Sequence, residues 1–445
     1  MLALLGFATI IIMLSLIMTK KVSPVVALIV VPIVTATIGG FGEDIGRFVA
    51  SGIVSIAPTG VMFIFAILFF GVLTDAGTFQ PLIKNAIKFG GSDPLKITVA
   101  TSVVSMLAHL DGAGATTFLI VVPPMLILYK AVGMRNTTLA TIVALSAGTM
   151  NMVPWSAVPL RAATAVGGDV SSAELVGGII IPLAAGLLMV IGISYFLGLK
   201  ERKLVGFTSG SGNSAVDSAK MEQILKAVLT VDEEKAKLMR PKLIPLNVIT
   251  ILATVVVLVL NLMPAHTVFM LAFSFALVVN YPKVADQRAR VDAHAKSALM
   301  MASVLFAAGA LIGITRETGM ITEMAAVAVN LIPDTLGRFI AIFIGILAMP
   351  LSLLFDPDSF YLGILPVLME TAESFGIEGI NVARAALLGQ MTTGFPVSPL
   401  TPATFLLVGL ADVDIGEHQK KTIPLAFAVS NFMLLVAVLT GAIAF

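Results

Sequence analysis

Two apolar stretches of the chain each carry acidic side chains near their middle. His109 and Asp111 are the only Asp, Glu, His, Lys or Arg residues in 97–129, and Asp356 and Asp358 stand alone in a second such stretch. Ionisable groups at membrane depth are costly and by default mark a functional site. Aspartates in this setting can hold a proton, a cation or a metal-complexed anion, whereas they would repel a bare multivalent anion if ionised. His109 is equally able to carry a proton.

The residues around Asp111 predict a tight turn followed by a helix. Gly112 and Gly114 let the backbone bend and expose its N–H groups. Thr116 and Thr117 then open the returning helix, whose N-terminus favours an anion. We therefore expect these four residues to bind substrate together with Asp111.

A second turn is predicted at Asp356. Asp followed by Pro357 suits a helix start, with Asp356 as N-cap and Pro357 as the first helical residue. Asp356 is thus either a helix cap or a group that binds an ion or proton whose movement is coupled to that of a substrate. Asp358 is not needed as a cap, so we expect Asp358 and Ser359 to bind substrate, with Asp358 also serving the coupling ion or proton.

Two segments, 148–156 and 390–402, combine prolines with small hydroxyl and amide side chains inside apolar spans. Proline frees carbonyls in the preceding turn, and such carbonyls can coordinate cations while the side chains bond carboxylates. A proline-kinked packing helix is the alternative for either segment alone. The candidate substrate-binding residues in and beside these interruptions are Asn151, Ser156, Arg161, Thr393, Ser398 and Thr401.

Oxygen donors dominate this set, and oxygen is the ligand that Mg²⁺ and Ca²⁺ prefer. Asp111, Asp356 and Asp358 are therefore candidate ligands for a metal that travels with an anionic substrate. We expect no other cofactor. Proton coupling through one of these aspartates or His109 fits the same residues.

The composition of the chain is that of a membrane protein. Of 445 residues, 58% are hydrophobic and 12% are charged, whereas soluble chains have about 45–50% and about 25%. These values exclude a soluble enzyme and a disordered chain, and the net charge of +1 argues against a nucleic-acid partner. Spans of roughly 20 apolar residues are predicted at 1–18, 24–40, 58–74, 137–160, 173–199, 243–262, 265–282, 298–315, 381–410 and 421–445.

The stretches 97–129 and 339–369 are too long for one crossing and are broken in the middle. With arms of about 12 residues, or about 18 Å as helix, each is predicted to be a re-entrant hairpin. Ten spans and two hairpins place 22 of the 27 basic residues on one side, which is then cytoplasmic, with both termini outside. The segment 200–242, with nine basic and six acidic residues, is predicted to be a cytoplasmic linker.

The halves on either side of this linker, 1–199 and 243–445, align at an offset of 242 residues. This alignment pairs three prolines of the first half with three of the second: Pro124 with Pro366, Pro154 with Pro396, and Pro182 with Pro424. It also aligns the two predicted hairpins with each other. Five crossings per half make the halves inverted repeats, the plan of secondary transporters. The predicted fold is an all-α polytopic membrane protein with one hairpin and one discontinuous helix in each repeat. Duplication without transport is the alternative.

At these residues the chain resembles the bacterial citrate–divalent metal:proton symporters (CitMHS). The matching pieces are Thr19-Lys20-Lys21, Gly39 to Gly42, Ala57 to Gly60, Leu110 to Gly112, Gly114 to Thr117, Asn151 with Pro154-Trp155, Ser398 to Leu400, Leu406 to Gly409 and His418 to Lys420.

The resemblance implies a symporter for citrate or a related di- or tricarboxylate, free or as a divalent-metal complex, coupled to protons. It places the chain in the ion-transporter superfamily, and so implies a homodimer with elevator-like motion in the cell (inner) membrane. The resemblance also implies that the two substrate-binding hairpin tips are Asp111 to Thr117 and Asp356 to Ser359. Ala113 stands where the family pattern often has a second acid, which leaves open free citrate, a smaller dicarboxylate or another metal.

Three other functions remain open. A sodium-coupled dicarboxylate transporter is one, although this chain lacks the Ser-Asn-Thr tips of the divalent-anion symporters. A cation/proton antiporter would also need buried aspartates. An intramembrane enzyme is disfavoured because the chain has no Gly-x-Gly-Asp or His-Glu-x-x-His run.

Overall fold

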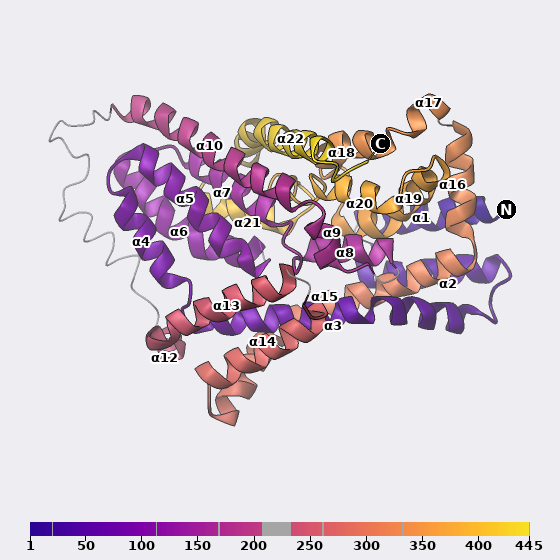
Figure 1. The fold of residues 1–445 in the computed structure, drawn as a ribbon, viewed down its shortest axis with the longest axis horizontal. Coiled ribbons are helices and arrows are strands. Elements are labelled where there is room, and N and C mark those ends of the chain that lie inside the picture. The colour runs from indigo at the N-terminus through magenta and orange to yellow at the C-terminus, as the bar shows by residue number, and fades with distance from the viewer. Residues whose placement is uncertain are drawn as a thin grey trace.

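The computed structural model describes residues 1–19, 21–112, 114–167, 170–206, 233–259, 262–331 and 333–444. Every regular element in these ranges is a helix, which confirms the predicted all-α class. The long helices α3, α10 and α15 run roughly along the longest axis of the molecule (Figure 1). Much of the predicted linker, from 207 to 232, falls outside the described residues.

The described residues of the first half form ten helical elements before α10. They are α1 (Leu2–Met18), α2 (Pro24–Ile38), α3 (Ile45–Asp75), α4 (Gln80–Gly90), α5 (Pro94–Ala108), the short 3-10 turn η1 (His109–Asp111), α6 (Gly114–Val132), α7 (Asn136–Met150), α8 (Ala157–Val166) and α9 (Ser172–Gly177). The helix α10 (Ile180–Val205) then runs into the linker.

The second half follows the same order. After α12 (Glu233–Leu238) and η2 (Pro241–Leu243) come α13 (Ile244–Val259), α14 (Ala265–Asn280), α15 (Val284–Glu317), α16 (Met320–Leu331), α17 (Asp334–Gly337), α18 (Ile340–Leu351), the π-helical η3 (Ser359–Ile364), α19 (Leu365–Ser374), α20 (Gly379–Leu387), α21 (Pro402–Ala411) and α22 (Ile415–Leu439).

Helix bounds in the two halves follow the offset of 242 residues found in the sequence. α1 and α13 begin at Leu2 and Ile244, and α3 and α15 end at Asp75 and Glu317. The broken span of the first half (α7, α8) likewise corresponds to that of the second (α20, α21). The order of elements therefore repeats, while the inverted orientation of the halves in a bilayer stays a prediction.

Several predicted spans differ from the helices. α3 and α15 begin well before the predicted spans at 58–74 and 298–315. The first turns of α15 are charged, and those of α3 mix apolar residues with Arg47, glycine and serine, so neither gives a continuous apolar run. The helices α4 and α16 were not predicted at all. Six helices of the described residues are long and apolar enough to cross a membrane by themselves.

The arms of the first hairpin are longer than the predicted 12 residues, whereas α18, the first arm of the second hairpin, has 12 residues as predicted. α5 and α6 have 15 and 19 residues, or roughly 22 and 28 Å at the helical rise. α5 begins at Pro94, three residues before the expected start, because Asp93 caps it: the Asp93 carboxylate accepts from the N–H of Leu95 at 3.0 Å. In the second half the arms are α18 and the continuous pair η3 and α19.

The helices α3 and α15 lie side by side over much of their length (Figure 1). Glycines permit this close contact. A Cβ atom on Gly52 would lie 1.9 Å from the carbonyl oxygen of Gly309, and one on Gly313 would lie 2.1 Å from the carbonyl oxygen of Phe48. Only glycine allows backbones to approach so closely. The two halves are thus packed together through their longest helices.

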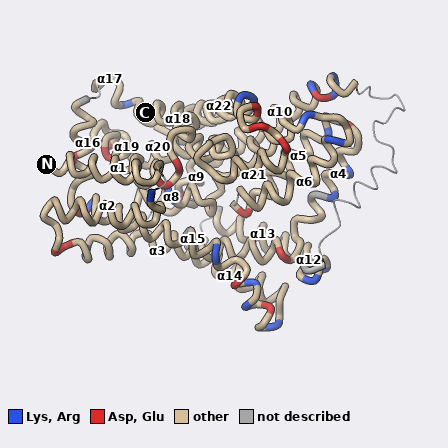
Figure 2. The backbone as a smooth tube through the Cα atoms, turned by 180° about the vertical axis from the view of Figure 1, so that it is seen from behind, with Lys and Arg blue, Asp and Glu red and all other residues tan. Residues whose placement is uncertain are grey.

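Charged residues gather at the ends of the helices. Figure 2 shows Lys and Arg near α4, the end of α10, α12 and the start of α15, and the two chain ends at the opposite end of the molecule. Lys84, Lys203, Arg240 and Lys283 belong to this basic group. The side of a membrane that these residues face stays a prediction.

Candidate functional site

The tip of the first hairpin is a tight turn between α5 and α6. η1 ends at Asp111, which is half-buried, and Gly112 follows with φ +69°. A Cβ atom on Gly112 would lie 3.0 Å from the Cα of Ser156, and one on Gly114 would lie 2.8 Å from the ring of Phe395. The predicted glycine turn therefore brings the tip against both interruptions. Thr116 is half-buried in the first turn of α6.

His109 is fully buried beneath this tip. Its Nδ1 lies 2.8 Å from Thr117 Oγ1, and its Nε2 lies 3.3 Å from Asn151 Oδ1. The Asn151 amide donates through Nδ2 to the carbonyl oxygen of Met391 at 2.8 Å, which turns Oδ1 towards the histidine. Because Oδ1 can only accept, the imidazole carries its proton on Nε2, and Nδ1 accepts from Thr117.

The first interruption, between α7 and α8, bonds to the hairpin tip. Trp155 Nε1 donates to the carbonyl oxygen of Leu110 at 2.6 Å. Ser156 precedes α8, and its Oγ donates to the carbonyl oxygen of Asn151 at 2.5 Å. The Trp155 ring also stacks on Phe70 of α3, with centroids 5.9 Å apart. The site therefore rests directly on one of the long central helices.

The second interruption, between α20 and α21, bonds to the second hairpin in a similar way. Ser398 Oγ donates to the carbonyl oxygen of Ser352 at 2.5 Å. Ser352 Oγ donates to Gln390 Oε1 at 2.6 Å and accepts from the N–H of Met391 at 2.8 Å. Tyr361 OH donates to the carbonyl oxygen of Gln390 at 2.8 Å. Hydrogen bonds thus join each interruption to the hairpin of its own half.

Carbonyls of the second interruption were predicted to be free for a cation, and this is wrong for several of them. Protein side chains donate to those of Gln390, Met391, Phe395, Pro396 and Val397. Thr401, for example, donates to the carbonyl oxygen of Phe395 at 2.8 Å. Buried backbone acceptors are nearly always bonded, and here the chain supplies its own donors.

Some buried polar atoms at the interruptions have no hydrogen-bond partner among the described residues. They are Thr149 Oγ1, Gln390 Nε2 and Thr393 Oγ1. A buried hydroxyl or amide without a partner is costly. These atoms are therefore available to water or to a substrate oxygen, as was predicted for Thr393.

The second hairpin contains the predicted capped turn. Asp356 Oδ1 accepts from the N–H groups of Asp358 and Ser359 at 3.0 Å, and its Oδ2 accepts from Ser359 Oγ at 2.5 Å. The capping role of Asp356 is confirmed. Both of its oxygens and the Ser359 hydroxyl are thereby engaged within the turn.

Asp358 forms a buried ion pair with Arg161 of α8. The distance from Arg161 Nε to Asp358 Oδ1 is 2.5 Å, and the two side chains are 6% and 11% exposed. Arg161 Nη1 also donates to the carbonyl oxygen of Ala157 at 3.1 Å. The pair joins the first half to the second hairpin. The sequence identified both residues but not their pairing.

The three aspartates do not form a common metal site. Within the described ranges, no three His, Asp, Glu or Cys side chains are grouped so that they could hold a metal ion. The physical reason is that Asp358 faces Arg161 and Asp356 is engaged as a cap. The predicted ligand set is therefore not assembled in this structure.

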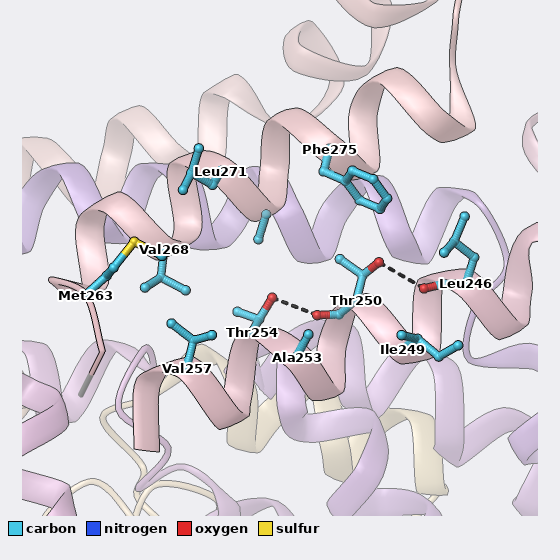
Figure 3. Close-up of a pocket in the computed structure, with 11 residues that line it drawn as sticks. Leu246, Ile249, Thr250, Ala253, Thr254, Val257, Met263, Val268, Leu271 and Phe275 are labelled. Atoms are coloured by element: carbon cyan, nitrogen blue, oxygen red, sulfur yellow. Dashed lines mark hydrogen bonds between the residues drawn. The ribbon is translucent and has the colours of Figure 1, made fainter. Parts of the chain in front are cut away.

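An apolar groove elsewhere is unsuited to a carboxylate. It lies between α13 and α14, has a volume of about 360 Å³, and is lined by residues such as Ile249, Val257 and Phe275. Figure 3 shows that its two hydroxyls, on Thr250 and Thr254, point to carbonyls of their own helix. None of the described residues that line it is charged.

Sequence reasoning missed several residues that shape the site. Ser352, Tyr361 and Phe395 were not chosen as candidates. The repeat could have pointed to Ser352, since it corresponds to Leu110 at the offset of 242, and both carbonyls accept from a neighbouring interruption. Phe395 stacks on His109 and Phe118, with centroids 5.9 and 6.0 Å apart, and no local pattern reveals such a contact.

Comparisons with known proteins identify relatives of this chain. The family model described as "CitMHS: Citrate transporter" matches residues 10–389. Two proteins of Bacillus subtilis (strain 168), named "Citrate transporter" and "Mg(2+)/citrate complex secondary transporter", are 42% and 40% identical, with 100% of this chain and at least 99% of theirs covered.

Solved structures share the fold at low identity. The YdaH transporter of Alcanivorax borkumensis matches with a TM-score of 0.56 and 16% identity over 88% of this chain and 87% of its own. MtrF of Neisseria gonorrhoeae matches with a TM-score of 0.59 and 13% identity over 89% and 84%. From its sequence matches over almost its full length, the chain belongs to the CitMHS family of citrate transporters.

Proposed function

We propose that this protein is a secondary transporter that carries citrate into the cell, free or complexed with a divalent metal, in symport with protons. The observation that carries the proposal is the buried pair of Arg161 and Asp358 beside two interrupted helices. The names of the relatives support citrate as the substrate.

In the empty transporter the charges of Arg161 and Asp358 compensate each other. A lone buried charge would cost several kcal/mol, roughly, so the pair keeps the site stable without substrate. A citrate carboxylate can replace Asp358 as the partner of Arg161, because guanidinium binds carboxylates in a fixed fork geometry. Binding of substrate then leaves Asp358 without its cation.

The released Asp358 explains coupling. Its carboxylate takes up either a proton or one coordination position of the metal in a metal–citrate complex. A citrate trianion bound to a divalent cation keeps one net negative charge, which Arg161 neutralises. Asp111, half-buried at the other tip, is the second candidate for the metal or the proton. Thr393 and Gln390 supply unpartnered donors for the remaining substrate oxygens.

His109 is better suited to orienting the site than to carrying the proton. Both ring nitrogens already have partners, Thr117 and Asn151, inside a fully buried pocket. A second proton on this ring would need Thr117 to turn its hydroxyl away. We therefore propose Asp358 rather than His109 as the main coupling group.

Alternating access is proposed to be elevator-like. The part that carries the hairpins and interruptions would move against the part formed by α3 and the helices α14 and α15, which both pack on α3. Trp155 lies at the boundary, stacked on Phe70 of α3 and 5.7 Å from the Phe269 ring of α14. We further propose a homodimer in the cell membrane with both termini outside.

Uptake of radiolabelled citrate into proteoliposomes tests the proposal. An inward proton gradient should drive accumulation of citrate, and Mg²⁺ or Ca²⁺ should increase it if the complex is the substrate. Accumulation driven only by a sodium gradient would favour the sodium-coupled dicarboxylate alternative. A cation/proton antiporter would accumulate no citrate under any gradient.

A further inference from the structure

The first turns of α22 reach into the second interruption. His418 Nε2 lies 2.9 Å from the carbonyl oxygen of Pro396, and Gln419 Nε2 donates to the carbonyl oxygen of Val397 at 2.8 Å. The His418 side chain is fully buried. Because a carbonyl can only accept, the imidazole carries its proton on Nε2.

These donors replace the hydrogen bonds that the broken helix lacks. The backbone between α20 and α21 is not helical, and Pro396 has no N–H of its own. A buried carbonyl left without a donor would destabilise this backbone. His418 and Gln419 therefore hold two consecutive carbonyls of the interruption from a neighbouring helix.

The held segment determines where Phe395 lies. Phe395 directly precedes Pro396, and its ring stacks on His109 and Phe118 of the first hairpin. It also fits closely over Gly114, where a Cβ atom would lie 2.8 Å from the ring. A shift of the Pro396 carbonyl would thus be transmitted to the tip of the first hairpin.

The other side of the imidazole also has a partner. His418 Nδ1 lies 3.3 Å from Thr422 Oγ1, which in turn lies 2.9 Å from Thr141 Oγ1 of α7. With Nε2 protonated, Nδ1 accepts from the Thr422 hydroxyl. The neutral ring is therefore fully bonded, and it joins α7 of the first half to the interruption of the second.

Several charged residues on the elements around this turn are partnered elsewhere. Lys421 donates to Thr138 Oγ1 at 2.6 Å, and Thr138 donates to Glu201 at 2.5 Å. Arg135 pairs with Glu201 at 2.7 Å. Two more pairings complete this set: Lys130 with Asp412 at 3.0 Å, and Asp414 with the N–H groups of Gly416 and Glu417.

The first half has no counterparts of the side-chain donors His418 and Gln419 at the corresponding positions. At the offset of 242 residues, Pro396 corresponds to Pro154, whereas His418 and Gln419 correspond to Val176 and Gly177. Neither of these has a side-chain donor. The second interruption is thus held from outside by a feature that the repeat does not require.

We propose that His418, supported by Gln419, is a positioning residue for substrate binding. Its neutral imidazole N–H holds the Pro396 carbonyl, and so sets Phe395 and the second interruption against the tip of the first hairpin. It acts as a hydrogen-bond donor and carries no transported proton. This inference rests on the proposed function, since citrate is the ligand whose affinity it affects.

Three variants at one position separate these roles. In His418→Gln the amide nitrogen can reach the position of Nε2, whereas in His418→Asn it is too short, and His418→Leu has no donor. Citrate affinity should fall on the order of tenfold in the Leu and Asn variants, the effect of one lost hydrogen bond to a buried carbonyl. The Gln variant should stay within about threefold of the wild type. His266→Gln on α14 is a matched control that should leave affinity unchanged.

Two readouts decide the proposal. Hydrogen–deuterium exchange of peptides covering 388–401 should rise in His418→Leu and stay at the wild-type level in His418→Gln. The pH profile of citrate uptake should be the same in His418→Gln as in the wild type. A Gln variant as impaired as the Leu variant, or one with a changed pH profile, would overturn the proposal. If the wild type bound no citrate, the proposed function would fail. The exchange measurement would still test whether His418 holds the Pro396 carbonyl.

Discussion

Replacing Asp358 by Asn removes the negative partner of a buried arginine. Asp358 and Arg161 are 11% and 6% exposed and meet at 2.5 Å. In Asp358→Asn the guanidinium keeps its bond to the Ala157 carbonyl but has no counter-charge. Removing one partner of such a buried pair costs about 3–5 kcal/mol of stability. We expect a clearly lower unfolding temperature for this variant.

The chain offers a matched control for this change. Asp44 and Arg47 also form an ion pair, at 3.1 Å, but their side chains are 50% and 72% exposed. Exposed pairs contribute about 0–1 kcal/mol, so Asp44→Asn should leave the unfolding temperature nearly unchanged. The double variant Arg161→Gln/Asp358→Asn should recover much of the lost stability, because no buried charge remains.

Thermal unfolding of the purified protein in detergent, with and without citrate, measures these effects. Citrate should raise the unfolding temperature of the wild type by mass action. It should give no such rise in the double variant, which lacks Arg161 and so cannot bind the carboxylate. An Asp358→Asn variant as stable as Asp44→Asn would refute the argument that the pair compensates a buried charge.

Three further predictions concern other parts of the molecule. Asn151→Leu should weaken citrate binding by on the order of tenfold, because the Met391 carbonyl and His109 both lose their partner; equilibrium binding measures this, and an unchanged affinity would contradict it. Gly313→Ala should prevent normal packing of α15 on α3, because a Cβ atom there would lie 2.1 Å from the Phe48 carbonyl oxygen. Gly46→Ala is the control, since a Cβ atom on Gly46 would have nothing within 4 Å. The yield of monodisperse protein measures the effect, and equal yields from the two variants would count against the close contact. For Asp93, burial raises the pKa, but hydrogen bonds from Arg202 and the Leu95 N–H outweigh it, so that the pKa lies below its usual value of 3.8. Its pairing therefore stabilises the fold above about pH 4 and is lost as the pH falls through the lowered pKa; Asp93→Asn should flatten the acid side of a stability curve measured from pH 7 to 3, and an unchanged curve would show that the pair does not contribute.

Much of the fold could be predicted because apolar runs and prolines act locally. The acids at Asp111 and Asp356 predicted both hairpin tips, and the prolines predicted both interruptions. Asp356 followed by Pro357 even predicted the cap that is found. The first turns of α3 and α15 were not predicted, because hydropathy shows where a helix meets lipid and not where the helix begins.

The site was predicted less completely because its contacts join distant residues. Arg161 and Asp358 are 197 positions apart, and Asn151 and Met391 are 240 apart. Residue type made Asp358 a candidate for a functional role but could not show that its carboxylate would pair with Arg161. His418 was noticed only as part of a matching motif, since its partner carbonyl at Pro396 becomes visible only once α22 is placed.

The central claim is that citrate takes Arg161 from Asp358 and that Asp358 then takes up a proton. Calorimetric titration of metal-free protein with citrate, in buffers of different ionisation enthalpy, measures the protons taken up on binding. We predict that the wild type takes up about one proton more than Asp358→Asn. Equal proton uptake by the two proteins, with citrate bound by both, would contradict the account.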